Sequence, residues 1–188
     1  MLSGSFFYFS RLTDNTKMDK KNLPNLRGEP GWIALEYPES LKDKPSFVIG
    51  DPSKDRLAVR YFIRESDKRF FGKVFFGEAT QGPPGHAHGG SMAAVLDEAM
   101  GFSAWIAGHT VVAAKITVEY LQMLPVNSTV TVEAWVESVD GRKVMTKGKI
   151  YSDDDVFSTS EGLFINIPAE KFGDASHYLY KVKGQGEK

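Results

Sequence analysis

One long apolar segment near the middle of the chain limits the folds that the chain can adopt. It begins in the stretch GPPGHAHGGSMAAVLDEAMG, residues 82–101, and continues through FSAWIA to residue 107. This pattern predicts a helix over about residues 89–107, because both prolines lie before it and an HGG turn leads into it. A helix that is apolar nearly all round must be buried, so the rest of the chain has to enclose it.

Two adjacent carboxylates, Asp97 and Glu98, interrupt this apolar segment. A charged group is costly to bury without a partner, so both acids need an explanation. Small residues one turn away, Ala93 and Gly101, leave room beside Asp97 for a substrate or for another stretch of backbone. Glu98 points about 100° away around the helix, so the two acids have different surroundings.

Two segments before the helix have the composition of β-strands. Residues 56–64 (RLAVRYFIR) and 68–80 (KRFFGKVFFGEAT) are rich in aromatic and β-branched side chains. Residues 65–67 (ESD) predict a hairpin turn between them. We therefore expect an antiparallel pair of strands on the N-terminal side of the helix.

A third predicted strand follows the helix at residues 110–121, where apolar side chains recur at every second position. One predicted face carries Val112, Ala114, Ile116, Val118 and Tyr120. The opposite face carries Ala113, Lys115, Thr117 and Glu119.

Three further strands are predicted at residues 129–139, 143–152 and 156–167. The pair Asp140–Gly141 is a strong hairpin signal, and the acidic run at residues 153–155 predicts another turn. The resulting order is β-β-α-β-β-β-β. It predicts an α+β fold in which one antiparallel sheet is wrapped around a long central helix.

Length and composition predict a single domain with extensions. The chain has 188 residues, of which 41% are hydrophobic, and it can bury a substantial core without cross-links. We expect a flexible N-terminal extension at residues 1–30, the folded domain at residues 31–168 and a C-terminal tail at residues 169–188. The absence of cysteine excludes disulfides, thiolate metal sites and a cysteine nucleophile.

The net charge and the N-terminal sequence indicate which binding partners and which cell compartment to expect. A net charge of −1 creates no field that would recruit nucleic acid or an anionic membrane. The first ten residues are apolar, but they are too few to span a bilayer and lack the basic start of a secretory signal. We expect no nucleic-acid partner, no membrane span and a cytoplasmic protein, with the mitochondrial matrix as the alternative.

The start of the predicted helix could bind an anion. A helix that begins near Gly89 leaves its first N–H groups unpaired and carries partial positive charge at that end. Such an end favours an anion or a developing oxyanion, and Gly89 and Gly90 let backbone approach a ligand closely. An isolated HGG is more often a plain glycine-rich connection, so the carboxylate that follows it carries much of the functional interpretation.

The stretch GPPGHAHGGSMAAVLDEAMG resembles the helix signature of hot-dog-fold acyl-CoA thioesterases, in the branch of phenylacetyl-CoA-type enzymes and thioesterase superfamily member four. VIGDPSKDRLAVRYF and ITVEYLQMLPVNSTVTVEAWVESVDGRK resemble strands of the same branch, so the resemblance covers about residues 46–167. It implies a hot-dog fold and the hydrolysis of an acyl-CoA to a free acid and CoA. It implies no metal and no redox cofactor.

The resemblance also implies roles for three residues. Asp97 matches the catalytic carboxylate, which acts as general base toward water or as nucleophile toward the thioester carbonyl. Gly89 matches the residue whose N–H polarises that carbonyl. His88 matches the histidine that orients the loop and helps to close the site.

Five further residues are candidates for substrate binding. Gly90 lies next to the oxyanion position, and Arg142 matches a family position that contacts substrate. Lys143 and Lys147 lie near the same hairpin and could meet the phosphates of CoA. Ala113 stands where the family has a Ser or Thr that steadies the attacking water. Gly82 stands where some relatives have an Asn, so the chain departs from the family at these last two positions.

Besides thioester hydrolysis, two other functions stay open. The Ala113 departure leaves room for a non-catalytic hot-dog module that binds an acyl-CoA or another lipid-like ligand. A hot-dog hydratase or dehydratase would need a histidine and an acid at one substrate carbon, which the spacing matches less well. A metal site built from His86, His88 and Asp97 is disfavoured, because the carboxylate lies far along the helix.

The spacing of the catalytic candidates predicts an assembly. Gly89 and Asp97 are eight residues apart, which corresponds to about 12 Å along a helix. One helix therefore cannot bring both groups to one carbonyl carbon, and a partner helix running antiparallel must supply the second. We expect a homodimer, with a dimer of such dimers as the alternative.

Overall fold

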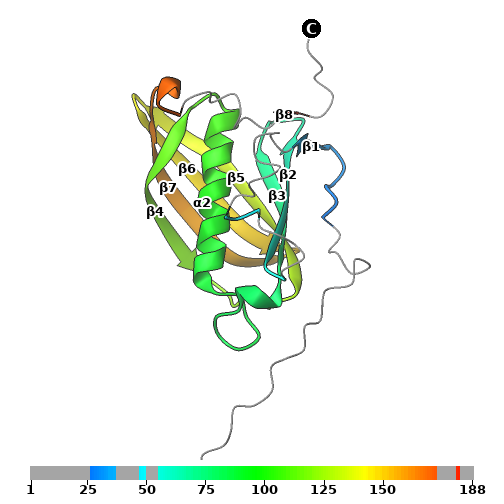
Figure 1. Cartoon of the computed structure of the whole chain (residues 1–188). Coiled ribbons are helices and arrows are strands. Elements are labelled where there is room, and N and C mark those ends of the chain that lie inside the picture. Colours follow the sequence, from blue (N-terminus) through cyan, green and yellow to red (C-terminus); the bar gives the residue numbers. More distant parts are fainter. Residues whose placement is uncertain (1–25, 37–46, 50–54, 173–180, 183–188) are drawn as a thin grey trace, which may run out of the picture.

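The computed structural model describes residues 26–36, 47–49, 55–172 and 181–182, and in it an antiparallel sheet curves around one long helix (Figure 1). The helix is α2 (Gly89–Ile106). The sheet order is β4-β7-β6-β5-β3-β2-β1-β8, and every neighbouring pair is antiparallel. The predicted wrapping of one sheet around one helix is confirmed.

From β2 to β7 the elements follow the predicted order, whereas β1 and β8 were not predicted from the sequence. The described residues include two short 3₁₀ helices, η3 (Glu78–Thr80) and η4 (Ala169–Phe172). The strands are β1 (Trp32–Glu36), β2 (Leu57–Arg64), β3 (Phe70–Phe76), β4 (Val111–Tyr120), β5 (Ser128–Asp140), β6 (Lys143–Ser152), β7 (Asp155–Asn166) and β8 (Lys181–Val182).

The core lies between α2 and the concave face of the sheet (Figure 1). The helix buries one side, formed by Met92, Val95, Leu96, Ala99, Met100, Ser103 and Ala104. These positions recur every three or four residues, so the described residues cover one face of α2 and not the whole helix, contrary to the burial all round that its apolar sequence predicts. Gly148 of β6 lets the helix approach closely, since a Cβ there would lie 3.2 Å from Leu96 Cδ2.

The first predicted hairpin is present, but its second strand is shorter than predicted. It begins at Phe70, because residues 65–69 turn and Lys68 adopts a positive φ of 59°. It ends at Phe76, because the next residues form η3, where Thr80 N–H and Oγ1 both bond to Gly77 O. The prediction that residues 68–80 are all strand is therefore wrong at both ends.

Strand β4 departs from the predicted alternation. A bulge interrupts its pairing with β7 between Ala113 and Lys115, so the side-chain period shifts by one residue. Val111 is buried, whereas Val112 is 41% exposed, contrary to the prediction. The predicted face is correct only from Ile116 onward, and the bulge transfers Ala113 to the side of α2.

The later hairpins agree with the sequence. Gly141 adopts a positive φ of 55° in the turn between β5 and β6, as the Asp140–Gly141 signal predicts. Asp153 has a φ of 49° in the turn before β7, which begins at Asp155.

Two short segments outside the predicted domain bounds contact the sheet. Glu29, within the predicted N-terminal extension, forms an ion pair with Lys73 at 2.7 Å. Lys181–Val182, within the predicted tail, pairs with β1 as β8. Residues 1–25 and most of the tail lie outside the described residues.

Candidate active site

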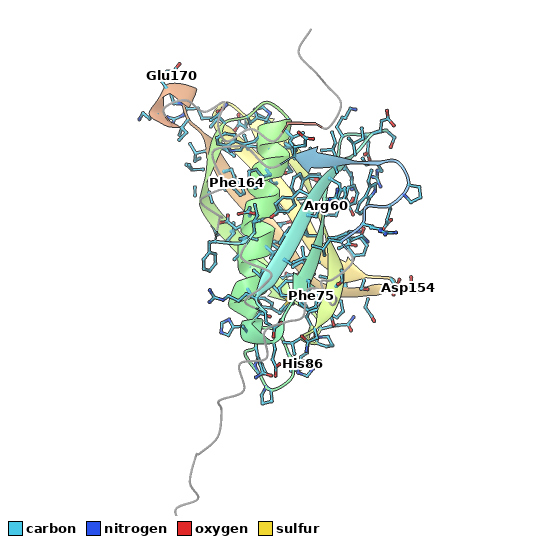
Figure 2. All side chains as sticks on the ribbon, turned by 45° about the vertical axis from the view of Figure 1, so that its right-hand side comes forward. Arg60, Phe75, His86, Asp154, Phe164 and Glu170 are labelled. Atoms are coloured by element: carbon cyan, nitrogen blue, oxygen red, sulfur yellow. The ribbon has the colours of Figure 1, made fainter. Side chains whose placement is uncertain are left out.

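The loop before α2 is tied to neighbouring backbone at several points. Ala87 N–H donates to Leu124 O at 2.8 Å, and Val126 N–H donates to Gly85 O at 3.0 Å. His88 N–H donates to Thr80 O at 2.8 Å. Figure 2 shows His86 at the end of the molecule where this loop lies. These bonds hold the glycine- and proline-rich turn in one conformation, so the start of α2 is fixed.

His88 is the N-cap of α2. Its Nδ1 accepts a hydrogen bond from Gly90 N–H at 2.9 Å, so a neutral ring carries its hydrogen on Nε2. Two glycines make space for this ring. A Cβ at Gly90 would lie 2.9 Å from Nδ1, and a Cβ at Gly82 would lie 2.9 Å from Cα and Cδ2 of His88. The departure at Gly82 therefore has a steric reason, because a side chain there would collide with His88.

The N–H of Gly89 is available at the helix start. The N–H groups of Ser91 and Met92 donate to His88 O, and that of Gly90 donates to the imidazole. Among the described residues, no acceptor pairs with Gly89 N–H. Because this group lies at the positive end of an 18-residue helix, it can stabilise an oxyanion.

Asp97 lies on the side of α2 that turns away from the buried core positions. Gly90, Ala93, Ala94 and Gly101 lie within about 60° of it around the helix, and none of the four is buried. Asp97 itself is half-buried, and this burial raises the pKa of its carboxyl group. Within the described parts of the chain, its carboxylate has no hydrogen-bond or ion-pair partner.

Glu98 has a different environment, as the 100° separation predicts. Its Oε1 accepts a hydrogen bond from Tyr61 Oη at 2.6 Å. Tyr61 is only 3% exposed, and its ring packs against Phe70 and Phe102 with centroids 4.9 and 5.7 Å away. Glu98 therefore ties α2 to β2, which leaves Asp97 as the carboxylate that is available for chemistry.

The β4 bulge turns Ala113 to the face of the sheet that packs on α2, where it is exposed. It pairs with Phe164, which Figure 2 places next to α2. A Cβ at Gly101 would lie 3.5 Å from Cε1 of the same phenylalanine ring. Ala113 is therefore level with the part of α2 that follows Asp97, and its side chain supplies no hydroxyl there.

The structure does not bring the predicted lysines to the same place. In β6 the residues that face α2 are buried, namely Val144, Thr146, Gly148 and Ile150. Lys143 and Lys147 alternate with them and point outward. Lys147 forms ion pairs with Glu137 at 3.3 Å and Glu161 at 3.7 Å. Arg142 lies in the β5–β6 turn, where its Nε donates to Asn166 O at 3.2 Å.

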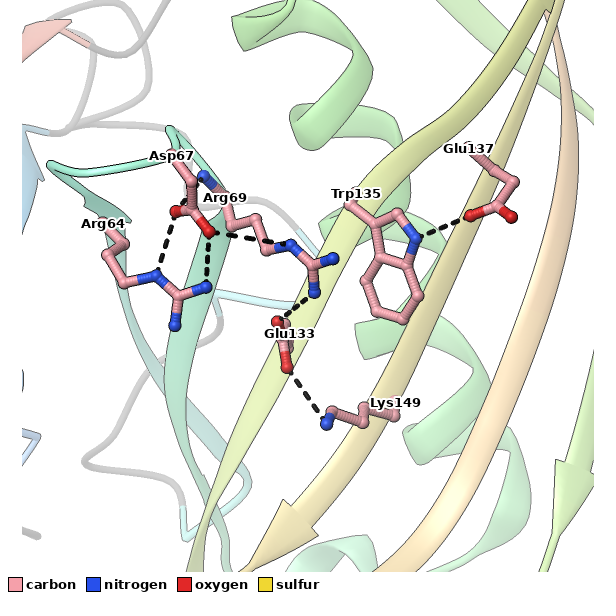
Figure 3. Close-up of polar contacts among 7 residues, drawn as sticks. All are labelled: Arg64, Asp67, Arg69, Glu133, Trp135, Glu137 and Lys149. Atoms are coloured by element: carbon pink, nitrogen blue, oxygen red, sulfur yellow. Dashed lines mark hydrogen bonds and ion pairs between the residues drawn. The ribbon is translucent and has the colours of Figure 1, made fainter.

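The outer face of the sheet carries a ladder of paired charges (Figure 3). Glu133 is only 6% exposed and lies between Arg69 at 2.7 Å and Lys149 at 3.1 Å. The Arg69 guanidinium also lies 4.7 Å from the centre of the Trp135 ring. A shallow cavity of about 260 Å³ opens on this face, lined by residues that include Lys147 and Lys149. Both lysines already pair with carboxylates, which disfavours phosphate binding there.

Neither a metal site nor a membrane-spanning helix is found among the described residues. His86 Nδ1 lies 2.9 Å from Pro84 O, and no three histidine or acidic side chains in the described ranges lie close enough together to hold a metal ion. None of the helices in this part of the chain has both the length and the hydropathy needed to cross a bilayer.

Comparison with known proteins identifies the family. The family model described as "Thioesterase superfamily" matches residues 84–158, which include the start of α2, Asp97 and Ala113. The acyl-coenzyme A thioesterase THEM4 of Xenopus laevis is 33% identical over 151 residues, covering 78% of this chain and 68% of that protein. The chain belongs to the thioesterase superfamily. The acyl-coenzyme A thioesterase THEM5 of Homo sapiens is 30% identical over 165 residues, covering 75% and 66% of the two chains.

A solved structure of another member agrees with this assignment. The crystal structure of a thioesterase superfamily protein matches with a TM-score of 0.55 and 34% identity, covering 58% of this chain and 54% of that one. The hot-dog fold predicted from the resemblance is confirmed, and so is the relationship to acyl-CoA thioesterases. The roles of individual residues stay predictions.

The raised pKa of Asp97 predicts a stability effect. Because its pKa is raised in the folded state, ionising the half-buried carboxyl costs the folded state free energy at neutral pH, so Asp97→Asn should raise the melting temperature there. This cost is absent once the carboxyl group is protonated in both the folded and the unfolded state. The increase in melting temperature should therefore shrink as the pH falls toward 4. Thermal unfolding at pH 7 and pH 4 measures this, with Asp153→Asn in an exposed turn as the control. A lower melting temperature for Asp97→Asn at pH 7 would contradict the prediction.

Proposed function

We propose that this chain is an acyl-CoA thioesterase that hydrolyses a thioester to a free acid and CoA. Asp97 is its general base or nucleophile, and the Gly89 N–H is its oxyanion donor. The observation that carries the proposal is the pairing state of these two groups. The Gly89 N–H and the Asp97 carboxylate have no described partner, whereas the neighbouring Gly90 and Glu98 are both engaged.

In the general-base route, Asp97 takes a proton from water as the water oxygen attacks the thioester carbonyl carbon. The carbonyl oxygen gains negative charge, which the Gly89 N–H and the positive end of α2 stabilise. Collapse of the intermediate breaks the C–S bond, and the CoA thiolate leaves and takes up a proton. In the nucleophilic route, Asp97 forms a mixed anhydride that water then hydrolyses. Partial burial of Asp97 suits either role, because a raised pKa makes a stronger base.

The two groups act together only across two chains. They lie in one helix, about 12 Å apart, whereas an oxyanion donor lies about 3 Å from its oxygen and an attacking atom within about 3.5 Å of its carbon. We propose a two-fold dimer in which Gly89 of one subunit meets Asp97 of the other. Each dimer then has two composite sites.

Strand β4 supports this dimer. It is a ten-residue strand at the edge of the sheet, and such an edge presents unpaired backbone groups to a second strand. It runs antiparallel to α2, because Tyr120 contacts Gly89 at one end and the Trp105 Nε1 donates to Val111 O at the other. Antiparallel pairing of β4 with a second β4 would therefore set the two helices antiparallel.

The position of the two-fold axis gives a prediction. Ala93 is midway between Gly89 and Asp97, so the axis should pass near it and bring two copies of Ala93 together. Because the chain has no cysteine, Ala93→Cys should form one intermolecular disulfide under mild oxidation. Non-reducing electrophoresis detects it, and Ala107→Cys, exposed beyond the end of α2, is the control. Equal cross-linking of both variants, or none at position 93, would contradict a dimer interface in which the two α2 helices meet near Ala93.

The proposed activity is tested with a panel of aryl and aliphatic acyl-CoA esters and detection of free thiol. Release of CoA from at least one ester supports hydrolysis. The second candidate function is a non-catalytic acyl-CoA-binding module, which the missing hydroxyl at Ala113 favours. Calorimetric binding of an acyl-CoA together with no thiol release across the panel would establish that alternative instead.

A further inference from the structure

One side chain outside the predicted catalytic group contacts Gly89, the proposed oxyanion donor, directly. Tyr120, near the end of β4, donates from its hydroxyl to Gly89 O at 2.9 Å. Its ring also lies against Gly89, since a Cβ there would be 3.1 Å from Cζ and 3.2 Å from Cε1. In the sequence, Tyr120 is only one of the residues on the apolar face of the predicted strand at residues 110–121.

The contact is part of a continuous chain of hydrogen bonds. Gly89 O and Gly90 N–H belong to the same peptide unit. The Tyr120 hydroxyl donates to Gly89 O, and the Gly90 N–H donates to His88 Nδ1 at 2.9 Å. The peptide between Gly89 and Gly90 is therefore held on both sides. Linked hydrogen bonds polarise and orient one another, so this arrangement is stiffer than either bond alone.

We propose that Tyr120 is a positioning residue that fixes the direction of the Gly89 N–H toward the substrate carbonyl. This inference rests on the proposed function, in which that N–H is the oxyanion donor. The Gly89 N–H belongs to the preceding peptide unit, between His88 and Gly89. Holding the next unit limits rotation about the Gly89 N–Cα bond, which is freer in glycine than in other residues. The Tyr120 hydroxyl supplies this constraint from β4, and His88 supplies it from the N-cap.

The role can be separated from a role in folding. Tyr120 is 52% exposed, and a single hydrogen bond at such a surface adds little to stability. Tyr120→Phe keeps the ring against Gly89 and removes only the hydroxyl. We expect a kcat about tenfold lower with a nearly unchanged KM and melting temperature, which is less than the loss of about 10²–10³ for removing an oxyanion donor outright.

The control for hydroxyl removal is Tyr151→Phe, because Tyr151 lies outside the proposed site on β6. Its kcat should stay at the wild-type value. A Tyr120→Phe enzyme within twofold of wild type would overturn the inference, as would a loss confined to the melting temperature.

A second test removes the amide that Tyr120 is proposed to position. Gly89→Pro deletes this N–H at the first helical position, where proline is favoured, and the His88 ψ of 136° suits a following proline. Gly89→Ala is the matched control, because it adds a Cβ against Tyr120 but keeps the N–H. If Tyr120 acts through the Gly89 N–H, adding Tyr120→Phe to Gly89→Pro should lower kcat no further.

The outcomes separate this inference from the function on which it rests. Equal losses from Tyr120→Phe in the wild-type and Gly89→Pro backgrounds would overturn the positioning role alone. A wild-type protein that releases no thiol from any ester, or a Gly89→Pro variant that matches Gly89→Ala, would refute the proposed oxyanion function itself.

Discussion

Asp97→Asn is expected to lower kcat by a factor of about 10²–10⁴ while acyl-CoA binding is retained. Asparagine has nearly the same shape as aspartate but cannot take a proton from water or form a mixed anhydride. The half-buried position of Asp97 and its small neighbours leave the amide enough room to adopt the same rotamer. Steady-state hydrolysis with thiol detection measures the loss, and calorimetry with a non-hydrolysable acyl-CoA analogue measures binding.

The neighbouring acid provides the control for this experiment. Glu98→Gln also replaces one carboxylate by an amide, but its carbonyl oxygen can still accept the hydrogen bond from Tyr61. We expect its kcat to stay within about threefold of wild type, because no reacting group is removed. An inactive Glu98→Gln beside an active Asp97→Asn would show that the catalytic carboxylate is Glu98.

The second large effect is recovery of activity from two inactive proteins. Asp97→Asn and Gly89→Pro each lose one half of every composite site. In a mixed dimer, Gly89 of the first subunit meets Asp97 of the second, so one site is complete and the other lacks both groups. Each mixed dimer should therefore recover up to about half of the wild-type activity, from a mixture whose components are nearly inactive.

Subunit exchange has to be verified alongside the activity, for example with differently tagged chains and native mass spectrometry. Each variant incubated alone under the same conditions is the control. Mixed dimers that form but hydrolyse no ester would refute the shared site, as would an active monomer isolated by size-exclusion chromatography.

The fold could be predicted because its signals are local. Proline and glycine at residues 82–90 and the apolar run after them determine where α2 begins, since helix starts depend on a few neighbouring residues. Strand alternation and the Asp140–Gly141 turn determine the β5–β6 hairpin in the same way. The separation of Asp97 from Gly89 also follows from sequence alone, because the rise of a helix is fixed.

Other features depend on contacts between distant residues. The β4 bulge arises in the pairing with β7, about fifty residues later, and it places Ala113 on the side of α2 that simple alternation excludes. The outward direction of Lys147 depends on which face of β6 meets the helix. The sequence shows its charge but not that direction.

The sequence by itself determined the helix and the order of the strands from β2 to β7, because these depend on local spacing. Its resemblance to the thioesterases named Asp97 and Gly89 as the catalytic candidates. Only the tertiary structure decided how the polar groups pair. It joined Glu98 to Tyr61 across 37 positions and Tyr120 to Gly89 across 31. Such bonds form between side chains that folding brings together, and no local periodicity encodes them. They distinguish the engaged Glu98 from Asp97, which has no partner among the described residues, and they hold the start of α2 in place.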